Sequence, residues 1–595
     1  MPFDNIFPNN RLPNAYANRN LSNGQLKTIS QNKLNSTDSL TKDLRLPLVK
    51  YYKDELDWVY KRCLAIGYSN SVSFDCVKGY YYRFLTKFIT PYLTYQIAEQ
   101  LRGNPGIINA IRTEDAAIRF YKGLINTAHG HLYQHPMADL PESESDKQKH
   151  ITGARLLMLR ESFMNFMQKT KERLRDSSVN LSSVGLVSGG AGINNLTKIT
   201  FTGSDPHHGM QVVLILHYGD TKIVYKPRDT RVDELIVGRR HNVGPHPCPG
   251  SLGEFLNANG LRTGDGVPDG IRGYAVPTYK FLSCGEYGFV QFLELDFSHS
   301  SQKHYERFAW LCGVYAGMAM IFGLTDLHQG NIMLCKQDVT SERSKTIKRT
   351  RHCVPHLTDL EIAFSSDVLG HAGWASAFGS TGLENAMRVS TETEYMNKFK
   401  FGRAGTSKLV KLKFENHATH TDNLPRSGGS PIRLVTKPTF GRSFKNGLIK
   451  VFKVLRSLSG DTLDGFVNRF IGCKVRFHAM GTPGQLGKIR SLCVMGLETT
   501  STAGLKANRG AFGNSLLSDW NRFDVAYYVK HVGGVNSGRV DHIGQGGVVT
   551  PIPGGAGATG GNTFSTVKNR IKNLPGDVAL EDFCEELKVK VTRAF

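Results

Sequence analysis

The first part of the chain changes from an unpatterned start to apolar residues at helical spacing. Residues 1–45 are rich in Asn, Ser, Leu and Pro without periodicity, which predicts a flexible N-terminal arm. From residue 46 to about 180, stretches such as 80–101 and 154–174 mix apolar and charged residues with the period of a helix. We therefore expect a helical domain over 46–180 that supports the protein or docks a substrate.

Strand patterns follow a Gly-rich segment at 183–192. Val212-Val-Leu-Ile-Leu-His217 and Lys222-Ile-Val-Tyr-Lys226, separated by Tyr-Gly-Asp-Thr, predict a β-hairpin. Residues 305–324 are apolar on nearly every side, which predicts a buried helix leading directly into Asp326. These patterns together indicate an α+β fold.

Glycines crowd together with Val, Ser and Pro at 533–561. The chain contains no Gly-rich phosphate-binding motif that ends in Lys-Ser or Lys-Thr. We therefore expect 533–561 to be a mobile Gly-rich loop and not a phosphate cradle.

Composition and charge narrow the class of protein. The 595 residues are 40% hydrophobic and 21% charged, as expected for a folded, enzyme-sized body of several structural units. The 74 Lys and Arg against 51 Asp and Glu give a net charge of +23, which predicts attraction to anions. The densest basic run, at 341–351, lacks the interleaved aromatic residues of a base-stacking surface, so we expect no nucleic-acid partner.

The cysteines and the apolar runs indicate the compartment. Ten scattered cysteines form no Cys-x-x-Cys pair and have no His at zinc spacing, which favours a reducing environment. We expect no membrane span and a cytoplasmic protein, because signal-sequence and long apolar patterns are missing. The Asn- and Ser-rich arm would also suit an effector secreted by a dedicated apparatus.

Two short segments carry residues suited to phosphoryl transfer. Asp326-Leu-His-Gln-Gly-Asn331 follows the buried helix, and Leu357-Thr-Asp359-Leu-Glu361 is an apolar, strand-like segment with both carboxylates on one face by period two. Phosphoryl transfer needs cations on the phosphates, oxygen ligands for magnesium and a group that orients the attacking hydroxyl. Asp326 would orient or deprotonate the hydroxyl, while Asn331, Asp359 and Glu361 would hold Mg²⁺.

Lys226 adds a cation to this set. It ends the second strand of the predicted hairpin, where a strand lysine reaches nucleotide phosphates in kinases. Taken alone, Lys226 also fits a surface strand end, and Asp326-Leu-His-Gln-Gly-Asn331 also fits a capped turn. Their joint presence favours an ATP- and magnesium-dependent enzyme.

Further motifs make the pattern more specific. Gly203-Ser-Asp-Pro-His-His-Gly209, Val224-Tyr-Lys-Pro-Arg228 and Tyr287-Gly-Phe-Val-Gln-Phe292 precede the two acidic segments. In order and spacing, these five motifs resemble the dehydratase domain of class II lanthipeptide synthetases, the lanthionine synthetase M type. The resemblance covers residues 180–445 by motif.

The resemblance implies a two-lobed fold similar to lipid kinases, with an N-lobe at 181–300 and an elaborated C-lobe at 301–595. Such a domain phosphorylates Ser and Thr of a peptide with ATP and eliminates the phosphate, leaving dehydroalanine or dehydrobutyrine. It implies that Asp326 serves the hydroxyl, that Asn331 and Asp359 hold magnesium with Glu361 in or near its shell, and that Lys226 serves both half-reactions. The matching positions that also fall on functional positions of the family are Asp205, His207 and His328.

Elimination of the phosphate requires two further groups in the site. A base must remove the α-proton and a cation must neutralise the departing phosphate. Arg433-Leu-Val-Thr-Lys-Pro-Thr439 resembles the family's Arg and Thr pair for this step, and Arg suits bidentate phosphate contact. A basic strand followed by a Pro turn is the alternative interpretation. After Thr439 the chain reads Phe-Gly-Arg-Ser-Phe, where the family has an aromatic-apolar helix.

Three hypotheses follow. The leading one is a stand-alone dehydratase, because the chain ends at Phe595 without the family's zinc-dependent cyclase domain and would leave ring formation to a separate cyclase. The alternative is a protein or small-molecule kinase, including a secreted effector, that phosphorylates without elimination and differs at Arg433 and Thr439. The third is a pseudoenzyme that only binds peptide or nucleotide. The partner in the first case is a peptide or protein with Ser or Thr.

Overall fold

The computed structural model describes the chain in segments. They are residues 53–81, 84, 144–202, 204–261, 275–295, 302–328, 330–339, 350–365, 400–404, 409–413, 426–427, 430–431, 438–458, 460–482, 484–486, 489, 512–520, 522–553, 563–574 and 576–593; in several of these segments, including 144–158, 400–404 and 409–413, only the backbone is described. The predicted arm at 1–45, most of the predicted helix at 80–101, and Arg433 lie outside this part of the chain.

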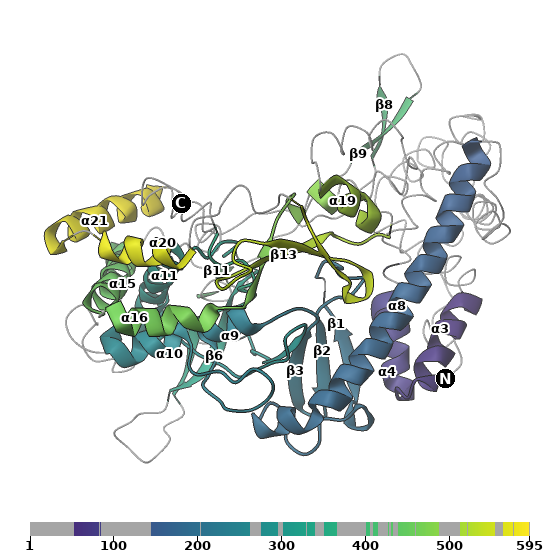
Figure 1. The fold of residues 1–595 in the computed structure, drawn as a ribbon, viewed down its shortest axis with the longest axis horizontal. Helices are drawn as coiled ribbons and strands as arrows, with labels where there is room; N and C mark the ends of the chain where they lie inside the picture. The colour runs from purple at the N-terminus through teal and green to yellow at the C-terminus, as the bar shows by residue number, and fades with distance from the viewer. Residues whose placement is uncertain are drawn as a thin grey trace.

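The N-terminal described part is helical, as its apolar spacing predicts. Tyr80 stacks on Phe163 with ring centroids 5.0 Å apart, and Leu56 and Phe166 are buried in the same core. The long helix α8 contains the predicted stretch 154–174 and runs beside α3, α4 and the sheet (Figure 1). The helices are α3 (Lys53–Ala65), α4 (Asn70–Asp75), the π-helix η3 (Cys76–Tyr81) and α8 (Glu144–Ser183).

A five-stranded antiparallel sheet in the order β1-β2-β3-β5-β4 follows. The predicted hairpin is confirmed, since β2 and β3 pair with Leu214 opposite Tyr225 and turn at Gly219, whose φ is 61°. Lys226 stands at the end of β3, opposite Gly288. The strands are β1 (Lys198–Phe201), β2 (Leu214–Tyr218), β3 (Thr221–Lys226), β4 (Phe281–Ser283) and β5 (Gly288–Gln291).

Helices build the largest core. The predicted buried helix is confirmed as α11, whose residues 308–322 are all about 1% exposed or less apart from the glycines. A Cβ on Gly313 or Gly447 would collide with the backbone of the facing helix, so glycine lets α11 and α15 cross closely. The helices are α9 (Arg231–Val237), α10 (Leu252–Leu256), η5 (Asn257–Leu261), α11 (Gln302–Phe322), α15 (Pro438–Ser457), α16 (Gly460–Val467), α20 (Thr563–Lys572) and α21 (Asp577–Arg593).

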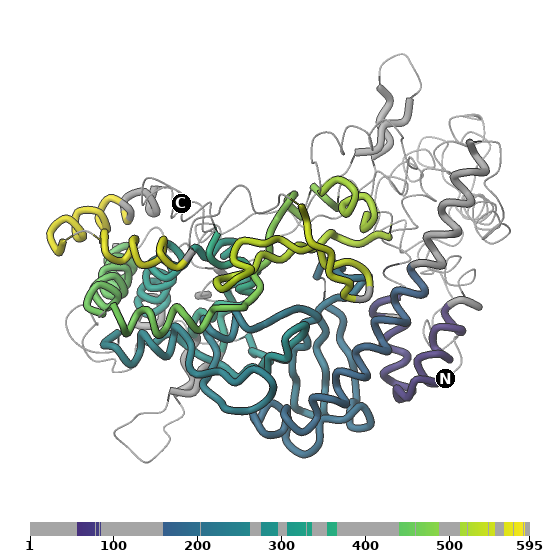
Figure 2. Tube along the Cα trace, viewed as in Figure 1, coloured from purple at the N-terminus to yellow at the C-terminus, as the bar shows by residue number. Residues whose placement is uncertain are grey.

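A second antiparallel sheet, in the order β12-β13-β14-β15, lies against the loop that precedes β2. Val525 N donates to Pro206 O at 2.9 Å, and Figure 2 shows the late chain running beside this much earlier segment. The elements are β12 (Lys474–Phe477), α19 (Phe512–Trp520), β13 (Tyr527–His531), β14 (Val540–Ile543) and β15 (Val549–Pro551). The remaining elements are η4 (Ile193–Asn195), β6 (Ile332–Val339), β7 (Thr350–Leu357), β8 (Lys400–Ala404), β9 (Leu409–Lys413), β10 (Arg426–Ser427), β11 (Ser430–Pro431), η7 (Asn468–Phe470) and η8 (Gln545–Gly547).

The prediction of a mobile loop at 533–561 is wrong for its described residues, 533–553. They form the turn after β13 and then β14 and β15, and Val540 is buried. Gly533, Gly534, Gly538 and Gly547 have positive φ, so the glycines shape tight turns between paired strands. Residues 554–561 lie outside the described part.

The described chain is α+β, as predicted, with helices and antiparallel sheets. None of its described helices is long and apolar enough to cross a membrane. Each cysteine whose side chain is described is a free thiol.

Candidate active site

Lys226, the last residue of β3, contributes a buried cation to the site. Its Nζ lies 2.7 Å from Asp359 Oδ1 and 3.3 Å from Asp233 Oδ1, and its side chain is 10% exposed. Pro227 follows, and because proline has no N–H it ends the strand ladder at this point. The lysine is therefore held between a helix carboxylate and the segment after β7.

Arg228, two residues on, carries the densest set of contacts. Its guanidinium donates to both oxygens of Asp233 at 2.7 and 3.0 Å, to Asp359 Oδ1 at 2.6 Å, and lies 3.0 Å from Glu361 Oε2 through Nε. Asp233 lies in the first turn of α9 and also accepts from Leu360 N at 3.0 Å. Against the effect of burial, Arg228 and Lys226 lower the pKa of Asp233, so it stays ionised.

The segment 358–364 is irregular, so its prediction as a strand is wrong. β7 ends at Leu357, and Asp359 has a φ of 55°, which breaks the alternation of a strand. Asp359 and Glu361 nevertheless meet, because Arg228 bridges them. Against burial, Lys226 and then Arg228 lower the pKa of Asp359 far below the usual carboxyl value.

The loop after α11 lies beside this segment. Thr358 N donates to Asn331 O at 2.8 Å, and Thr325 N donates to Ile362 O at 3.2 Å. Asp326, like Asp359, has a positive φ, 62°. Two aspartates in the sparsely populated left-handed region, on adjacent loops, are a feature typical of functional sites.

Asp326 and His328 stand at the open edge of the site. Their side chains are 42% and 44% exposed, and His328 Nε2 lies 3.7 Å from Asp326 Oδ1. Asn331 Nδ2 donates to Asp326 O at 2.8 Å, which fixes the amide beside the aspartate. Partial burial raises the pKa of Asp326; the charge of Glu361 also raises it, and that of His328 opposes this.

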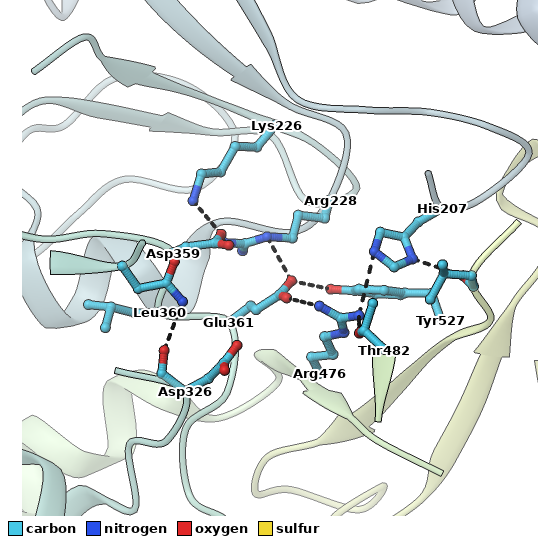
Figure 3. Close-up of polar contacts among 12 residues, drawn as sticks. His207, Lys226, Arg228, Asp326, Asp359, Leu360, Glu361, Arg476, Thr482 and Tyr527 are labelled. Atoms are coloured by element: carbon cyan, nitrogen blue, oxygen red, sulfur yellow. Dashed lines mark hydrogen bonds and ion pairs between the residues drawn. The ribbon is translucent and has the colours of Figure 1, made fainter. Parts of the chain in front are cut away.

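Glu361 joins the site to the second sheet (Figure 3). Its buried carboxylate forms an ion pair with Arg228, whose Nε lies 3.0 Å from Oε2, and accepts hydrogen bonds from Arg476 Nη1 and from Tyr527 Oη at 3.2 Å. Arg476 N also donates to Glu361 O at 2.8 Å. A carboxylate with three polar partners and a side chain 8% exposed organises the two arginines around it.

His207 approaches from the loop before β2. Its Nδ1 lies 2.8 Å from Val525 O, which only accepts, so Nδ1 carries the proton and Nε2 has the lone pair. Nε2 lies 3.5 Å from Arg476 Nη2. Burial and the charge of Arg476 lower the pKa of His207 well below the usual value, which keeps the ring neutral. Asp524 holds this loop by accepting from Gly209 N and Met210 N.

The structure brings most of the predicted residues together. Those that meet directly or across adjacent loops are His207, Lys226, Asp326, His328, Asn331, Asp359 and Glu361. Asp205 is partly buried in the loop of His207, and Thr439 is the second residue of α15. Arg433 lies outside the described residues, so its role stays a prediction.

Sequence reasoning missed four residues: Arg228, Asp233, Arg476 and Tyr527. Arg228 stood in the quoted motif Val224-Tyr-Lys-Pro-Arg228 and could have been found from its place two residues after Lys226. Arg476-Phe-His-Ala-Met-Gly-Thr482 repeats the Arg-to-Thr spacing of the predicted elimination pair, which was a usable signal. No sequence pattern pointed to Asp233 or Tyr527.

The site fits magnesium at two of its three predicted ligands. Within the described part of the chain, no hydrogen bond occupies Asn331 Oδ1 or Asp359 Oδ2. Both Glu361 oxygens are occupied by the arginines and Tyr527. No described cluster of three His, Cys, Asp or Glu forms a closed cage. One carboxylate and one amide are sufficient for Mg²⁺ when substrate phosphates supply further oxygens.

Comparison with known families adds one finding. Residues 155–241 match the family described as "Domain of unknown function (DUF4135)", a domain found in lanthionine synthetase-like proteins. The matched stretch contains His207, Lys226, Arg228 and Asp233 and ends before Asp326. No curated protein matches the chain. The chain is thus similar to lanthionine synthetase-like proteins over the stretch that supplies the cationic side of the site.

Proposed function

We propose that this protein is a lanthipeptide-type dehydratase with a kinase-like catalytic core. It would transfer phosphate from ATP to Ser or Thr hydroxyls of a peptide and then eliminate the phosphate. The proposal rests mainly on one observation: Lys226 forms ion pairs with both Asp233 of α9 and Asp359. In protein kinases a strand lysine likewise pairs with a helix carboxylate beside a magnesium-binding Asp.

The phosphorylation step would use the open edge of the site. Asp326 is partly exposed, so a peptide hydroxyl can reach it, and its raised pKa makes it a better proton acceptor than an ordinary aspartate. Asn331 and Asp359 would hold magnesium, which neutralises charge on the transferring phosphate when bound. Lys226 would move from Asp359 towards the nucleotide phosphates.

The elimination step would use the neutral ring of His207. In this step the α-proton of the phosphorylated residue passes to His207 Nε2, and the C–H electron pair becomes the second bond between Cα and Cβ. The Cβ–O bond breaks and its electron pair leaves with the phosphate. Nε2 is suited to this because the bond to Val525 O keeps the proton on Nδ1.

Product masses test the proposal directly. The protein would be mixed with ATP, magnesium and Ser/Thr peptides, and a mass decrease of one water per modified residue is expected. Lys226→Met should abolish all product, and Arg433→Ala should accumulate phosphopeptide. Accumulated phosphopeptide with the unaltered protein would instead establish the kinase alternative, and no consumption of ATP with any peptide would contradict both.

A further inference from the structure

We infer that Asp524 is a positioning residue for the elimination half of the proposed reaction. Its carboxylate fixes the turn that follows His207, and thereby the ring that takes the α-proton. The inference deepens the proposed function and rests on it for the identity of the reaction. The placement of His207 by Asp524 can be tested without any reaction.

The turn after His207 has a strained backbone. His207 and Gln211 pair across it, since His207 N donates to Gln211 O at 2.9 Å and Gln211 N donates to His207 O at 2.8 Å. The three residues between them, His208, Gly209 and Met210, have positive φ values of 55°, 85° and 68°. Only glycine adopts this left-handed conformation readily, so the two other residues cost free energy. Such a turn needs a contact that holds it in place.

Asp524 supplies that contact. Gly209 N donates to Asp524 Oδ2 at 2.5 Å, and Met210 N donates to Oδ1 at 3.3 Å. Successive N–H groups in a turn of this kind form a concave anion-binding surface, which the buried carboxylate fills. Burial and the charge of Asp519 raise the pKa of Asp524, whereas the two N–H groups oppose this. The turn and the carboxylate therefore stabilise each other.

The next residue, Val525, holds His207 itself. Its carbonyl accepts from His207 Nδ1 at 2.8 Å, and its N–H donates to Pro206 O at 2.9 Å. Tyr527, two residues further on, places its ring centroid 5.2 Å from that of His207 (Figure 3). A segment 318 residues later in the sequence thus binds the chain on both sides of His207 and determines where its ring stands.

The cation proposed for phosphorylation is held by other contacts. Lys226 pairs with Asp233 and Asp359, at the end of β3 and away from the turn that Asp524 binds. We therefore expect a change at Asp524 to displace the His207 ring and to leave Lys226 in place. The two half-reactions should respond differently.

Asp524→Asn tests the inference with a side chain of nearly the same size. The amide has one acceptor oxygen, so its NH2 group would face one of the two N–H donors and release the turn. Elimination from a chemically phosphorylated Ser peptide should slow about 100-fold, because misplacing a reacting group by roughly 1 Å costs a factor of that size. Phosphorylation by ATP should change little, so phosphopeptide should accumulate.

Asp541→Asn is the matched control. Asp541 is as deeply buried as Asp524, and on β14 it pairs with His531 and Arg539. Its substitution also removes a carboxylate from a buried network, but one that does not bind the turn. The ratio of elimination to phosphorylation should stay unchanged in this variant.

Heteronuclear NMR of the His207 ring nitrogens provides a measurement that needs no reaction. In the unaltered protein the proton should reside on Nδ1, which faces Val525 O. In Asp524→Asn the ring should leave this carbonyl, and the signals should move towards those of a mixture of both tautomers. The spectrum of His207→Gln identifies the signals by their loss.

The outcomes separate the two claims. Unchanged elimination in Asp524→Asn, or an equal loss of both half-reactions, would overturn the inference and leave the proposed function standing. If the unaltered protein makes no product from ATP, the proposed function fails, and the His207 spectrum still decides whether Asp524 positions the ring. If Asp524→Asn does not fold, Gly209→Ala decides, since alanine resists a φ of 85° and should displace the same turn.

Discussion

The two ends of the site are built differently. At the open end, Asp326 and His328 are 42% and 44% exposed and approach each other only to 3.7 Å. At the inner end, Arg228, Glu361 and Arg476 are 8–10% exposed and joined by direct ion pairs. In the proposed function, the open end would leave the Asp326 carboxylate available to substrate, and the inner end would hold the cations in place before substrate binds.

Burial explains why the inner end is so tightly paired. A buried arginine without a partner would carry a large desolvation cost, and Glu361 offsets that cost for two arginines at once. Because Arg228 follows β3 and Arg476 lies on β12, the same carboxylate joins both sheets to the segment after β7. The side chains of Asp326 and His328 at the open end do not join structural elements in this way. We therefore expect substitutions of these two residues to change activity without changing stability.

The largest expected effect comes from Asp326→Asn. The amide cannot accept the hydroxyl proton, so formation of phosphorylated or dehydrated peptide should fall roughly 10²- to 10⁴-fold. The melting temperature should stay unchanged, because the long contact to His328 is the only one that the Asp326 side chain makes among the described residues. Asp464→Asn is the control: Asp464 is equally exposed and pairs with Lys568, away from the site, so activity should persist. If the Asp326→Asn variant kept full activity, Asp326 would not be the group that accepts the hydroxyl proton.

The next effect is on stability and concerns the inner end. Glu361→Ala leaves Arg228 and Arg476 buried without their shared carboxylate, which should lower the free energy of unfolding by about 3 kcal/mol in urea titrations. Glu585→Ala removes an exposed carboxylate paired with Lys445 and should cost at most about 1 kcal/mol. Equal effects of the two substitutions would show that Glu361 does not organise the arginines.

Sequence patterns predict the parts of this molecule that local chemistry determines. The hairpin of β2 and β3 follows from two apolar runs around a turn, and α11 follows from its apolar residues on every side. That Lys226 and Asp359 belong to one site was expected from motifs resembling a known family, although their direct ion pair was not. These predictions depend on residues close together in sequence or on a motif order.

Other features depend on contacts between distant segments. Asp359 leaves the strand conformation with positive φ where it meets Lys226 and Arg228, and periodicity cannot signal that. Glu361 and Arg476 meet only through tertiary packing, so no local pattern joined them. The glycines after β13 looked like a loop because composition does not distinguish turns within a sheet from an unpaired segment.

A smaller effect on the inner end is expected from Tyr527→Phe. The substitution removes one donor, the hydroxyl 3.2 Å from Glu361 Oε2, and keeps the ring beside His207 and His208. Since Glu361 retains both arginines, the free energy of unfolding should fall by only about 1 kcal/mol, measured by urea titration. A loss as large as that of Glu361→Ala would mean that Tyr527, and not the arginines, holds Glu361 in place.

The smallest expected effect concerns His328 and appears only in the pH profile. If Asp326 is the base, activity is lost as pH falls through the pKa of Asp326. Burial and the charge of Glu361 raise this pKa above the usual 3.8, and the charge of His328 lowers it. His328→Ala removes this opposition, so the acidic limb of kcat/KM should move to higher pH while the plateau rate at higher pH stays. His217→Ala, on β2, is the control and should leave the limb in place. A plateau lowered at every pH without movement of the limb would show that His328 acts on the substrate itself and not through Asp326.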